Sequence, residues 1–368
     1  MASLTDVARV AGVSLTTASM VLNKGKQHNR VSAACAARVQ EAARQLGYVP
    51  NYHARSMKLG RAEVLAVAMD VGHEDEKSRV ELELSNPYFG FMLGGIERQT
   101  RSMNYLMTLV GPEARMRAPD RALLGIRQRR FDGMIVPGAV VRTDRTNFLS
   151  EPVDLPVVVI EPPVDTVHAC VVFDQLAGIS LAVQHLIELG HRHLLYVGEA
   201  GNMRHSDARG RHCEAECGRL GVHFDRVDLH LPSNEAFRNP DLQITSNARE
   251  FGEFLRSPGR HFTGIVCYND ITALGVMEAL GEAGYRVPTD VSVVGFDDTL
   301  ARYALPRLTT VSHELSEMGR LATDLCMEMV NDTEAIRRYR GTRSTVRPNL
   351  IQRSSCTTPG RGVHTEPR

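Results

Sequence analysis

The sequence has no tryptophan, few aromatic residues and none of the long apolar stretches that cross membranes. A transmembrane helix needs about 20 consecutive apolar residues, and no such run occurs among the 368 residues. The first ten residues also lack the basic-then-apolar pattern of a signal peptide. We therefore expect a cytoplasmic protein with no membrane partner, and the length predicts two or three compact units.

Cysteine pairs and catalytic signatures are absent as well. The seven cysteines are an odd number without a CxxC pair, which favours free thiols in a reducing compartment. No GxxxxGK, GxSxG or HExxH motif occurs, so phosphate transfer, acyl hydrolysis and zinc proteolysis lack their signatures. Two groups contain residue types that bind metals: His185, His191 and His193, and His212 with Cys213 and Cys217. The first group suits the entry of a strand better than a metal site, and the cysteines of the second suit a helix packed on a sheet. We expect no enzyme, no cofactor and no metal.

The formal net charge is zero, but the charges are unevenly distributed. Residues 1–61 contain nine basic and two acidic side chains, whereas the rest of the chain contains 34 basic and 41 acidic ones. The first segment therefore carries +7 and the remainder −7. A basic module on an acidic body indicates a polyanionic partner for the first segment, although short basic termini are also common as solubilising tails.

Helical periodicity in the first segment argues against a disordered tail. Apolar residues follow the spacing of a helix with one buried face over about residues 4–11. Ser3 and Asp6 have the spacing of a capping box, and Gly12 can end the helix in the left-handed conformation. A second helix begins after Ser14, close enough to the first that the two must cross steeply as a helix-turn-helix. Ser32 caps a third helix, and Gly47 ends it.

The outward face of the second helix is the predicted DNA-reading surface. In a helix-turn-helix, the N-terminal part of this helix enters the major groove, so the candidate base-reading residues are Leu15, Thr16, Ser19 and Met20. Short hydrogen-bonding residues near helix starts suit phosphate oxygens, and the candidates are Ser14, Thr17, Asn23 and Ser32. The alternative is that these residues are ordinary caps and surface positions.

Two stretches, LTDVARVAGVSLTTASMVLN and VSAACAARVQEAARQLGYVPNYHARSM, resemble the DNA-binding headpiece of the lactose/galactose repressor family. The resemblance implies a headpiece over 1–49 and a hinge helix and linker over 50–61. It places Ala54 and Met57 at the minor groove, with Met57 as the inserted apolar wedge; the alternative is a simple linker methionine. Met20 departs from the family's usual arginine and cannot donate to guanine. The Lys24–Arg30 stretch is longer than usual and is either a solvated loop or an extra phosphate contact.

Beyond Arg61, short apolar runs alternate with helical stretches, which is the pattern of parallel sheets flanked by helices. The expected strands are Val64–Met69, Tyr105–Val110, Gly133–Pro137, Val157–Ile160, Ala169–Phe173, Leu194–Val197, Gly264–Cys267 and Val291–Gly295. Helices are expected between them, for example at Tyr88–Ser102, Leu176–Leu189 and Ile271–Ala283. Ligands of such sheets bind beyond the carboxyl ends of the strands.

The same family resemblance continues through this body. It rests on NPYF, VVFD, HLIELGHRHLLYVGE, YNDITALGV and VPTDVSVVGFDD followed by LPRLTTV. It implies an α/β body over 62–350, like a periplasmic binding protein, with two doubly wound lobes joined by three crossovers. We expect one lobe over about 62–162 and 297–325, and the other over about 163–296 and 326–350. The resemblance also implies a small-molecule effector in the cleft between the lobes.

Position by position, the resemblance carries the effector-binding role to Tyr88, Phe89, Asp174, Arg209, Asn269 and Asp297. Carboxylates, an amide, an arginine and an aromatic face suit a sugar-like ligand. Two alternatives stay open: Arg209 and Asp297 form a salt bridge between the lobes, or Asn269 caps a helix. The chain departs from the family in an insertion at 70–84, in Pro162, where an arginine is usual, and in Glu214, where a glycine is usual.

Together these features predict a sequence-specific transcriptional regulator, in this family most often a repressor, that binds a near-palindromic DNA operator and responds to a sugar or related metabolite. The polar end of the chain, 351–368, predicts a disordered tail. It has no leucine heptad, so we expect a homodimer rather than a tetramer. A solute-binding transport protein and a sugar-processing enzyme are the competing interpretations. The operator, the effector and the sign of the response stay open.

Overall fold

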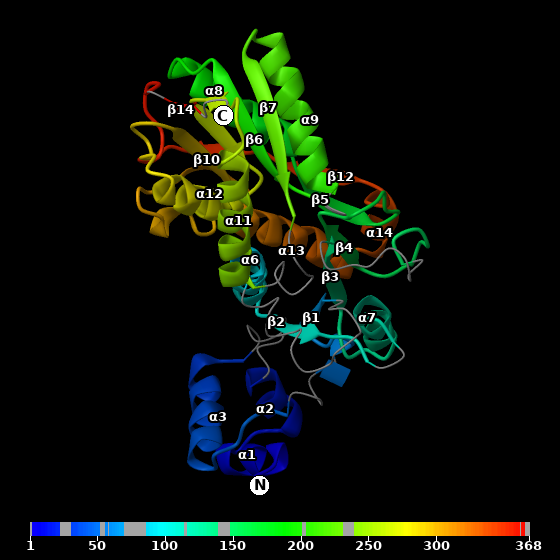
Figure 1. Ribbon diagram of the computed structural model, residues 1–368. Helices are drawn as coiled ribbons and strands as arrows, with labels where there is room; N and C mark the ends of the chain where they lie inside the picture. Colours follow the sequence, from blue (N-terminus) through cyan, green and yellow to red (C-terminus); the bar gives the residue numbers. More distant parts are fainter. Residues whose placement is uncertain are drawn as a thin grey trace. The chain divides into compact units, whose positions relative to one another are not determined.

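The computed structural model describes residues 2–22, 31–51, 56–57, 59–69, 86–113, 116–138, 148–200, 204–230, 239–360 and 362–364 (Figure 1). The chain divides into two compact units, one of residues 1–63 with 129–132 and the other of residues 64–128 with 133–368. Asn23, Ala54, the loop 24–30 and the insertion 70–84 lie outside the described residues. Within these residues, no helix is long and apolar enough to cross a membrane.

The named helices of the first unit, within its described residues, are α1 (Leu4–Ala11), α2 (Leu15–Leu22) and α3 (Ala33–Gln45). The predicted capping box is present, because the Ser3 hydroxyl accepts from the Asp6 backbone while the Asp6 carboxylate accepts from the Ser3 backbone. Gly12 ends α1 with φ 63°, the left-handed conformation that favours glycine. Buried residues of all three helices form a small core: Val7, Ala8, Ala11, Ala18, Val21, Val39, Ala42 and Ala43. The predicted helix-turn-helix is confirmed.

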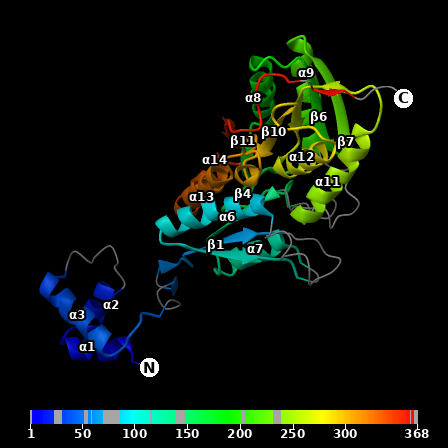
Figure 2. The same ribbon diagram turned by 60° about the vertical axis from the view of Figure 1, so that its left-hand side comes forward.

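The second unit contains two lobes, each built on a six-stranded sheet. The first sheet is entirely parallel, with the order β2 (Leu106–Val110), β1 (Val64–Ala68), β3 (Gly133–Pro137), β4 (Val157–Ile160), β5 (Ala169–Phe173) and β12 (Arg343–Val346). Its helices are α6 (Pro87–Ser102), α7 (Ala118–Arg127), α13 (Leu315–Asn331) and α14 (Thr333–Arg338). Helices α6 and α13 lie side by side (Figure 2). They approach closely because both have glycine at the crossing, where a Cβ on Gly95 or Gly319 would overlap backbone of the other helix.

The second sheet has the order β7 (His223–Leu229), β6 (His193–Glu199), β9 (Gly264–Cys267), β10 (Ser292–Asp297), β11 (Thr309–Ser312) and β13 (Asn349–Ile351). Only β13 runs antiparallel to its neighbour. The described helices of this lobe are α8 (Gln175–Glu188), α9 (Arg204–Arg219), α11 (Pro240–Leu255) and α12 (Asp270–Glu282), and a 3-10 turn, η3, spans Ala301–Tyr303. The expected strands and helices therefore exist, with ends that differ by one or two residues.

The lobe boundaries differ from those predicted. Strand β5 pairs with β4 in the first sheet, and β11 pairs with β10 in the second. The whole of α13 packs on the first sheet, so the predicted break near residue 325 would divide one helix. The three crossovers therefore follow β5, β11 and β12 rather than residues 162, 296 and 325. Strand pairing decides lobe membership, and the motif positions alone do not show it.

The end of the chain is ordered as far as the structure describes it, so the predicted disorder of 351–368 is wrong for 351–360 and 362–364. The Ser355 hydroxyl donates to the Val293 carbonyl at 2.6 Å and accepts from the Thr309 amide at 2.8 Å. Residues Val363–His364 form β14, which pairs with β8 (His261–Phe262), and Val363 is fully buried. The polar composition misled the prediction because these polar side chains satisfy backbone groups of the second sheet.

Candidate functional sites

The exposed face of α2 contains the predicted DNA-reading residues. Leu15 is 51% exposed although it is apolar, and Thr16 is exposed beside it. Ser19 and Met20 are half-buried on the same helix, while Ala18 and Val21 point into the core. The structure thus places the four predicted residues outside the core, which is the arrangement that base reading requires.

The predicted phosphate-binding hydroxyls are helix caps in this structure. The Ser14 oxygen accepts from the Thr17 amide at 3.1 Å and lies 2.8 Å from the Thr17 hydroxyl. Ser32 caps α3 by accepting from the Cys35 amide at 3.3 Å. In a capping hydroxyl the oxygen is the acceptor, so its hydrogen can still point to a phosphate. Met57, the predicted wedge residue, is 85% exposed.

In the second unit, polar side chains gather where strands end. Asp174 follows β5, Asn269 follows β9 and Asp297 ends β10, while Arg209 reaches the same region from α9. These strand ends belong to both sheets, and the carboxyl edge is where parallel sheets bind ligands. We use the name cleft for this region, where the family resemblance places the effector. The residues that we assign to it are Tyr88, Glu161, Asp174, Glu199, Arg209, Asn269, Asp297 and His313.

Arg209 is buried and held by neutral partners. Its Nε donates to the Gln175 side-chain oxygen at 3.0 Å, and an Nη donates to the Tyr268 carbonyl at 2.6 Å. Its guanidinium also lies 3.8 Å above the centre of the Phe296 ring. Arg209 and Asp297 both belong to the second lobe, and no ion pair joins them among the described residues. The alternative of a salt bridge between the lobes is therefore wrong.

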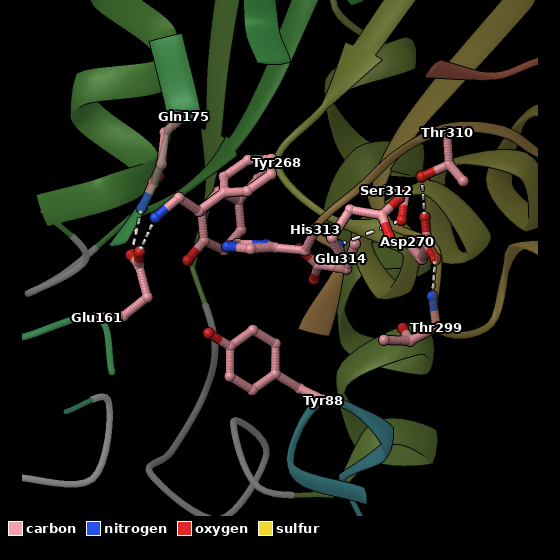
Figure 3. Close-up of polar contacts among 12 residues, drawn as sticks. Tyr88, Glu161, Gln175, Tyr268, Asp270, Thr299, Thr310, Ser312, His313 and Glu314 are labelled. Carbon is pink, nitrogen blue, oxygen red and sulfur yellow. Dashed lines mark hydrogen bonds and ion pairs between the residues drawn. The ribbon is translucent and has the colours of Figure 1, made fainter. Parts of the chain in front are cut away.

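Gln175 connects Arg209 to a carboxylate of the first lobe. Its amide nitrogen donates to Glu161 at 3.0 Å, and the Phe173 amide donates to the other Glu161 oxygen. Figure 3 shows this pair of bonds, with the Tyr88 side chain extending from α6 toward the same region. Glu161 directly follows β4 and is buried. The cleft therefore contains a continuous polar path from α9 to the first sheet.

The buried His313 pairs with Asp297, whose side chain is 15% exposed. The Asp297 backbone has φ 107°, a conformation unusual outside glycine, and its carboxylate lies 3.0 Å from His313 Nδ1. Burial raises the pKa of Asp297 to about 7, against the opposing effect of Arg209. Burial, together with Arg209, lowers the pKa of His313 to about 3. His313 is therefore neutral at pH 7, and its Nδ1 shares one hydrogen with the Asp297 carboxyl group.

Tyr88 and Phe89 start α6, which Asn86 caps through the Tyr88 amide at 3.0 Å. Tyr88 is half-buried, and its ring packs edge-on against that of His313, 5.6 Å between centroids. Burial raises the pKa of Tyr88, and the charges of Glu161 and Asp297 raise it further. Phe89 instead belongs to the apolar core of the first lobe and contacts Tyr88 edge-on. Of the two predicted residues, Tyr88 faces the polar groups and Phe89 supports it.

Asn269 is the N-cap of α12, as the alternative interpretation predicted. Its side-chain oxygen accepts from both the amide and the hydroxyl of Thr272, at 2.7 and 2.8 Å. The Thr272 hydroxyl also lies 2.8 Å from an oxygen of Glu199, which accepts from Gln243 at 2.6 Å. Because its oxygen is engaged, Asn269 offers its amide hydrogens. Asp174 likewise caps α8, accepting from the Ala177 amide at 3.0 Å.

Sequence reasoning missed Glu161, Gln175, Glu199 and His313. Glu161 directly follows β4, Glu199 ends β6 and His313 directly follows β11. The rule that ligands bind beyond strand ends would have selected all three. Strand β11 was not predicted, so His313 was not recognised as a strand-end residue. Glu161 was overlooked beside Pro162, the position at which the chain departs from the family.

Comparisons with known proteins agree with this architecture. Residues 3–51 match the family described as bacterial regulatory proteins, lacI family, and residues 183–356 match a periplasmic binding protein-like domain. The chain is 30% identical over 366 residues to the transcriptional regulator GalR of Salmonella typhimurium, covering 98% of this chain and 97% of that protein.

Two solved structures share the fold. The Lac repressor dimer bound to operator and the anti-inducer ONPF aligns with a TM-score of 0.70 at 22% identity, over 97% of this chain and 99% of that one. The CelR–cellobiose complex aligns with a TM-score of 0.60 at 22% identity, over 96% of this chain and 100% of that one. The relatives named here are transcriptional regulators rather than enzymes. With the helix-turn-helix, the two lobes and this full-length identity to GalR, the chain belongs to the lacI family of DNA-binding bacterial transcriptional regulators.

Proposed function

We propose that this chain is a homodimeric, cytoplasmic transcriptional repressor whose affinity for a near-palindromic operator is set by a small hydroxylated effector bound in the cleft. The observation that carries the effector half is the set of polar groups from both lobes that converge on one region: Tyr88 and Glu161 from the first, Arg209 and Asp297 from the second. Hydroxyl groups of a sugar-like ligand would meet acceptors on the carboxylates and donors on Asn269.

The DNA half of the proposal rests on the headpiece. Its exposed α2 face, its capped helix starts and the +7 charge of residues 1–61 suit a major groove flanked by phosphates. The Lac repressor dimer was solved on operator DNA, and we extend that assembly to this chain. Two headpieces on one dimer would read two half-sites related by a twofold axis, and Met57 with Ala54 would act at the minor groove between them.

Coupling between the effector site and the DNA-binding site follows from the crossovers between the lobes. Among the described residues the chain passes between the lobes in three crossover segments, so a ligand that contacts both lobes favours one lobe arrangement over others. Operator affinity and effector affinity must then change by the same factor. A regulator of this kind needs no chemical step.

The test selects DNA sites from a random pool with the full chain and measures binding by fluorescence anisotropy, with and without sugars, nucleosides and phosphorylated metabolites. We expect a near-palindromic site whose affinity falls steeply with salt, and at least one compound that changes it. A pool that yields no palindrome would overturn the regulator proposal.

Variants separate the two sites. Met20→Arg introduces a donor that can read guanine, and it should change the preferred base at one symmetric position of the operator. Gln40→Ala, at an exposed position of α3, is the matched control and should leave the preference unchanged. Tyr88→Phe removes one hydroxyl from the cleft; it should weaken the effector response about tenfold, as the loss of one hydrogen bond does, and leave the operator affinity intact.

A further inference from the structure

One side chain holds the two residues that precede the first strand of the body. The Asp132 carboxylate accepts from the backbone amides of Ala62 and Glu63, each at 2.7 Å and each with its own oxygen. Hydrogen bonds to an ionised acceptor are short and about twice as strong as those between neutral groups. Ala62 and Glu63 directly follow the predicted linker 50–61, and β1 begins at the next residue, Val64. We call Ala62, Glu63 and Asp132 the linker clamp.

The sheet fixes the place of Asp132 in turn. This residue ends the short connection between α7 and β3, and the next residue, Gly133, pairs with Leu65 of β1. Strands β1 and β3 are parallel neighbours, so they begin at the same edge of the sheet. The linker clamp closes at this edge, between the residues that lead into the two strands. It therefore lies where the chain passes from the predicted linker into the body.

The linker ends in a capped helical turn just before the clamp. Ser56, Met57 and Leu59 are helical, and Gly60 follows with φ 67°. The Arg61 amide donates to the Ser56 carbonyl at 3.3 Å, which is the outer hydrogen bond of a Schellman motif with Gly60 at its left-handed position. The amides of residues 61, 62 and 63 thus each have a defined acceptor. The chain between this turn and β1 is held residue by residue.

We propose that Asp132 is a positioning residue for DNA binding, which holds the end of the linker in one conformation so that the two headpieces of a dimer fit half-sites at one spacing. This inference rests on the proposed function and names a residue that acts on it without touching DNA. Residues that are fixed before DNA arrives do not have to be ordered on binding, so the linker clamp favours the complex entropically. It also limits the positions that the second headpiece can reach.

The alternative is that Asp132 only stabilises the entry of two strands. In that case its loss would lower the stability of the body, and every DNA site would be bound with the same relative preference as before. A positioning role instead predicts a change in the preference for half-site spacing. Spacing preference therefore distinguishes the two roles.

The experiment compares the full chain with Asp132→Asn by fluorescence anisotropy. Asparagine replaces one carboxylate oxygen with a donor, so one of the two amides loses its acceptor. The probes are the selected operator, the same duplex with one base pair inserted between the half-sites, and a duplex with a single half-site. The insertion moves the second half-site by about 3.4 Å and by about a tenth of a turn.

We expect the wild type to bind the selected operator much more tightly than the inserted one. Asp132→Asn should bind the selected operator about tenfold more weakly, as the loss of one hydrogen bond does, and should reduce the ratio of the two affinities at least fivefold. Its affinity for the single half-site should stay within about twofold of the wild type, because one headpiece needs no partner at a fixed distance. An unchanged ratio would overturn the inference.

Two further variants control for folding and charge. Gly60→Ala meets no atom within 4 Å, so it disfavours only the left-handed conformation, and it should reduce the same ratio. If far-UV circular dichroism shows that Asp132→Asn does not fold, Gly60→Ala decides the question. Asp165→Asn removes the same charge from a fully exposed side chain that pairs with Arg343, and it should leave the ratio unchanged.

Hydrogen exchange of the DNA-free protein tests the linker clamp directly. The amides of Ala62 and Glu63 should exchange slowly in the wild type and in Asp165→Asn, and faster in Asp132→Asn. Equal exchange in all three proteins would also overturn the inference. The two proposals fail separately: a random pool that yields no palindrome refutes the proposed function, whereas a selected operator with the same spacing ratio in wild type and variants refutes only the role of Asp132.

Discussion

Replacing Asp297 with asparagine should stabilise the protein, and the gain should grow with pH. Asp297 is buried in the field of several groups: His313 after β11, Arg209 on α9, Asp270 at the start of α12, Glu199 at the end of β6 and Tyr88 on α6. Asparagine keeps the shape and the oxygen that accepts from His313, and it tolerates positive φ better than most residues. The substitution therefore removes the charge with little other change.

The magnitude follows from proton linkage. The carboxyl titrates near 3.8 in the unfolded chain and near 7 in the folded one, so between these values the folded state binds more protons and the free energy of unfolding falls as pH rises. The full penalty above pH 7 corresponds to about 4 kcal/mol. Between pH 5 and pH 8 the stability of Asp297→Asn relative to the wild type should grow by about 2 to 3 kcal/mol.

The assay is urea unfolding of the ligand-free chain at pH 5 and pH 8. Far-UV circular dichroism is the appropriate signal, because the sequence has no tryptophan for fluorescence. Asp298→Asn is the matched control: its carboxylate pairs with Arg353 at 2.6 Å, so that variant should be less stable than the wild type at both pH values. A stability difference for Asp297→Asn that is the same at pH 5 and pH 8 would refute the reasoning.

Three further predictions test a helix cap, a helix–helix contact and a hydrogen-bonded serine outside the cleft. Ser3→Ala removes the capping box of α1 and should cost about 1 kcal/mol, seen as faster hydrogen exchange of the α1 amides, whereas exchange in the second unit should stay unchanged. Gly319→Ala places a methyl group against the Met92 carbonyl of α6 and should cost about 1 to 3 kcal/mol in urea unfolding; a neutral result would mean that the two helices can move apart. Ser355→Ala leaves the Val293 carbonyl and the Thr309 amide without their shared hydroxyl and should cost about 1 to 3 kcal/mol, with protease cleavage near the end of the chain as an independent signal.

Local signals in the sequence predicted much of this fold. Ser3, Gly12 and Ser32 act as caps in the structure because capping depends on neighbouring residues only. Strands buried on both faces, such as Val157–Ile160, were found because continuous apolar runs identify them. The edge strand β7, HFDRVDL, was missed because charged residues interrupt its apolar residues and because most of its residues are only partly buried. Strand β11 was missed because three of its four residues are Thr or Ser, although all four are buried.

The residues of the cleft were also predictable only in part. Asp174, Arg209, Asn269 and Asp297 were selected by motif. The structure places Asp174, Asn269 and Asp297 at strand ends and Arg209 on α9; their contact with an effector stays a prediction. Glu199 and His313 depend on which strands are neighbours and on how deeply each side chain is buried, and neither property is local in sequence. The predicted lobe boundaries were wrong because strand pairing is not local either: the pairing of β12 with β5 joins residues about 170 positions apart.

The discontinuous lobes also determine the order in which a newly made chain can fold. Residues 4–45 contain the three described helices of the headpiece, so this unit can fold early in synthesis. The first lobe lacks α13 and β12 until residue 346 has been made, and the second lacks β13 and β14 until residues 349–364 follow. A chain that stops short of these residues would carry a complete helix-turn-helix on two unfinished sheets, with open strand edges that invite aggregation. Completion of both lobes therefore depends on residues 343–364.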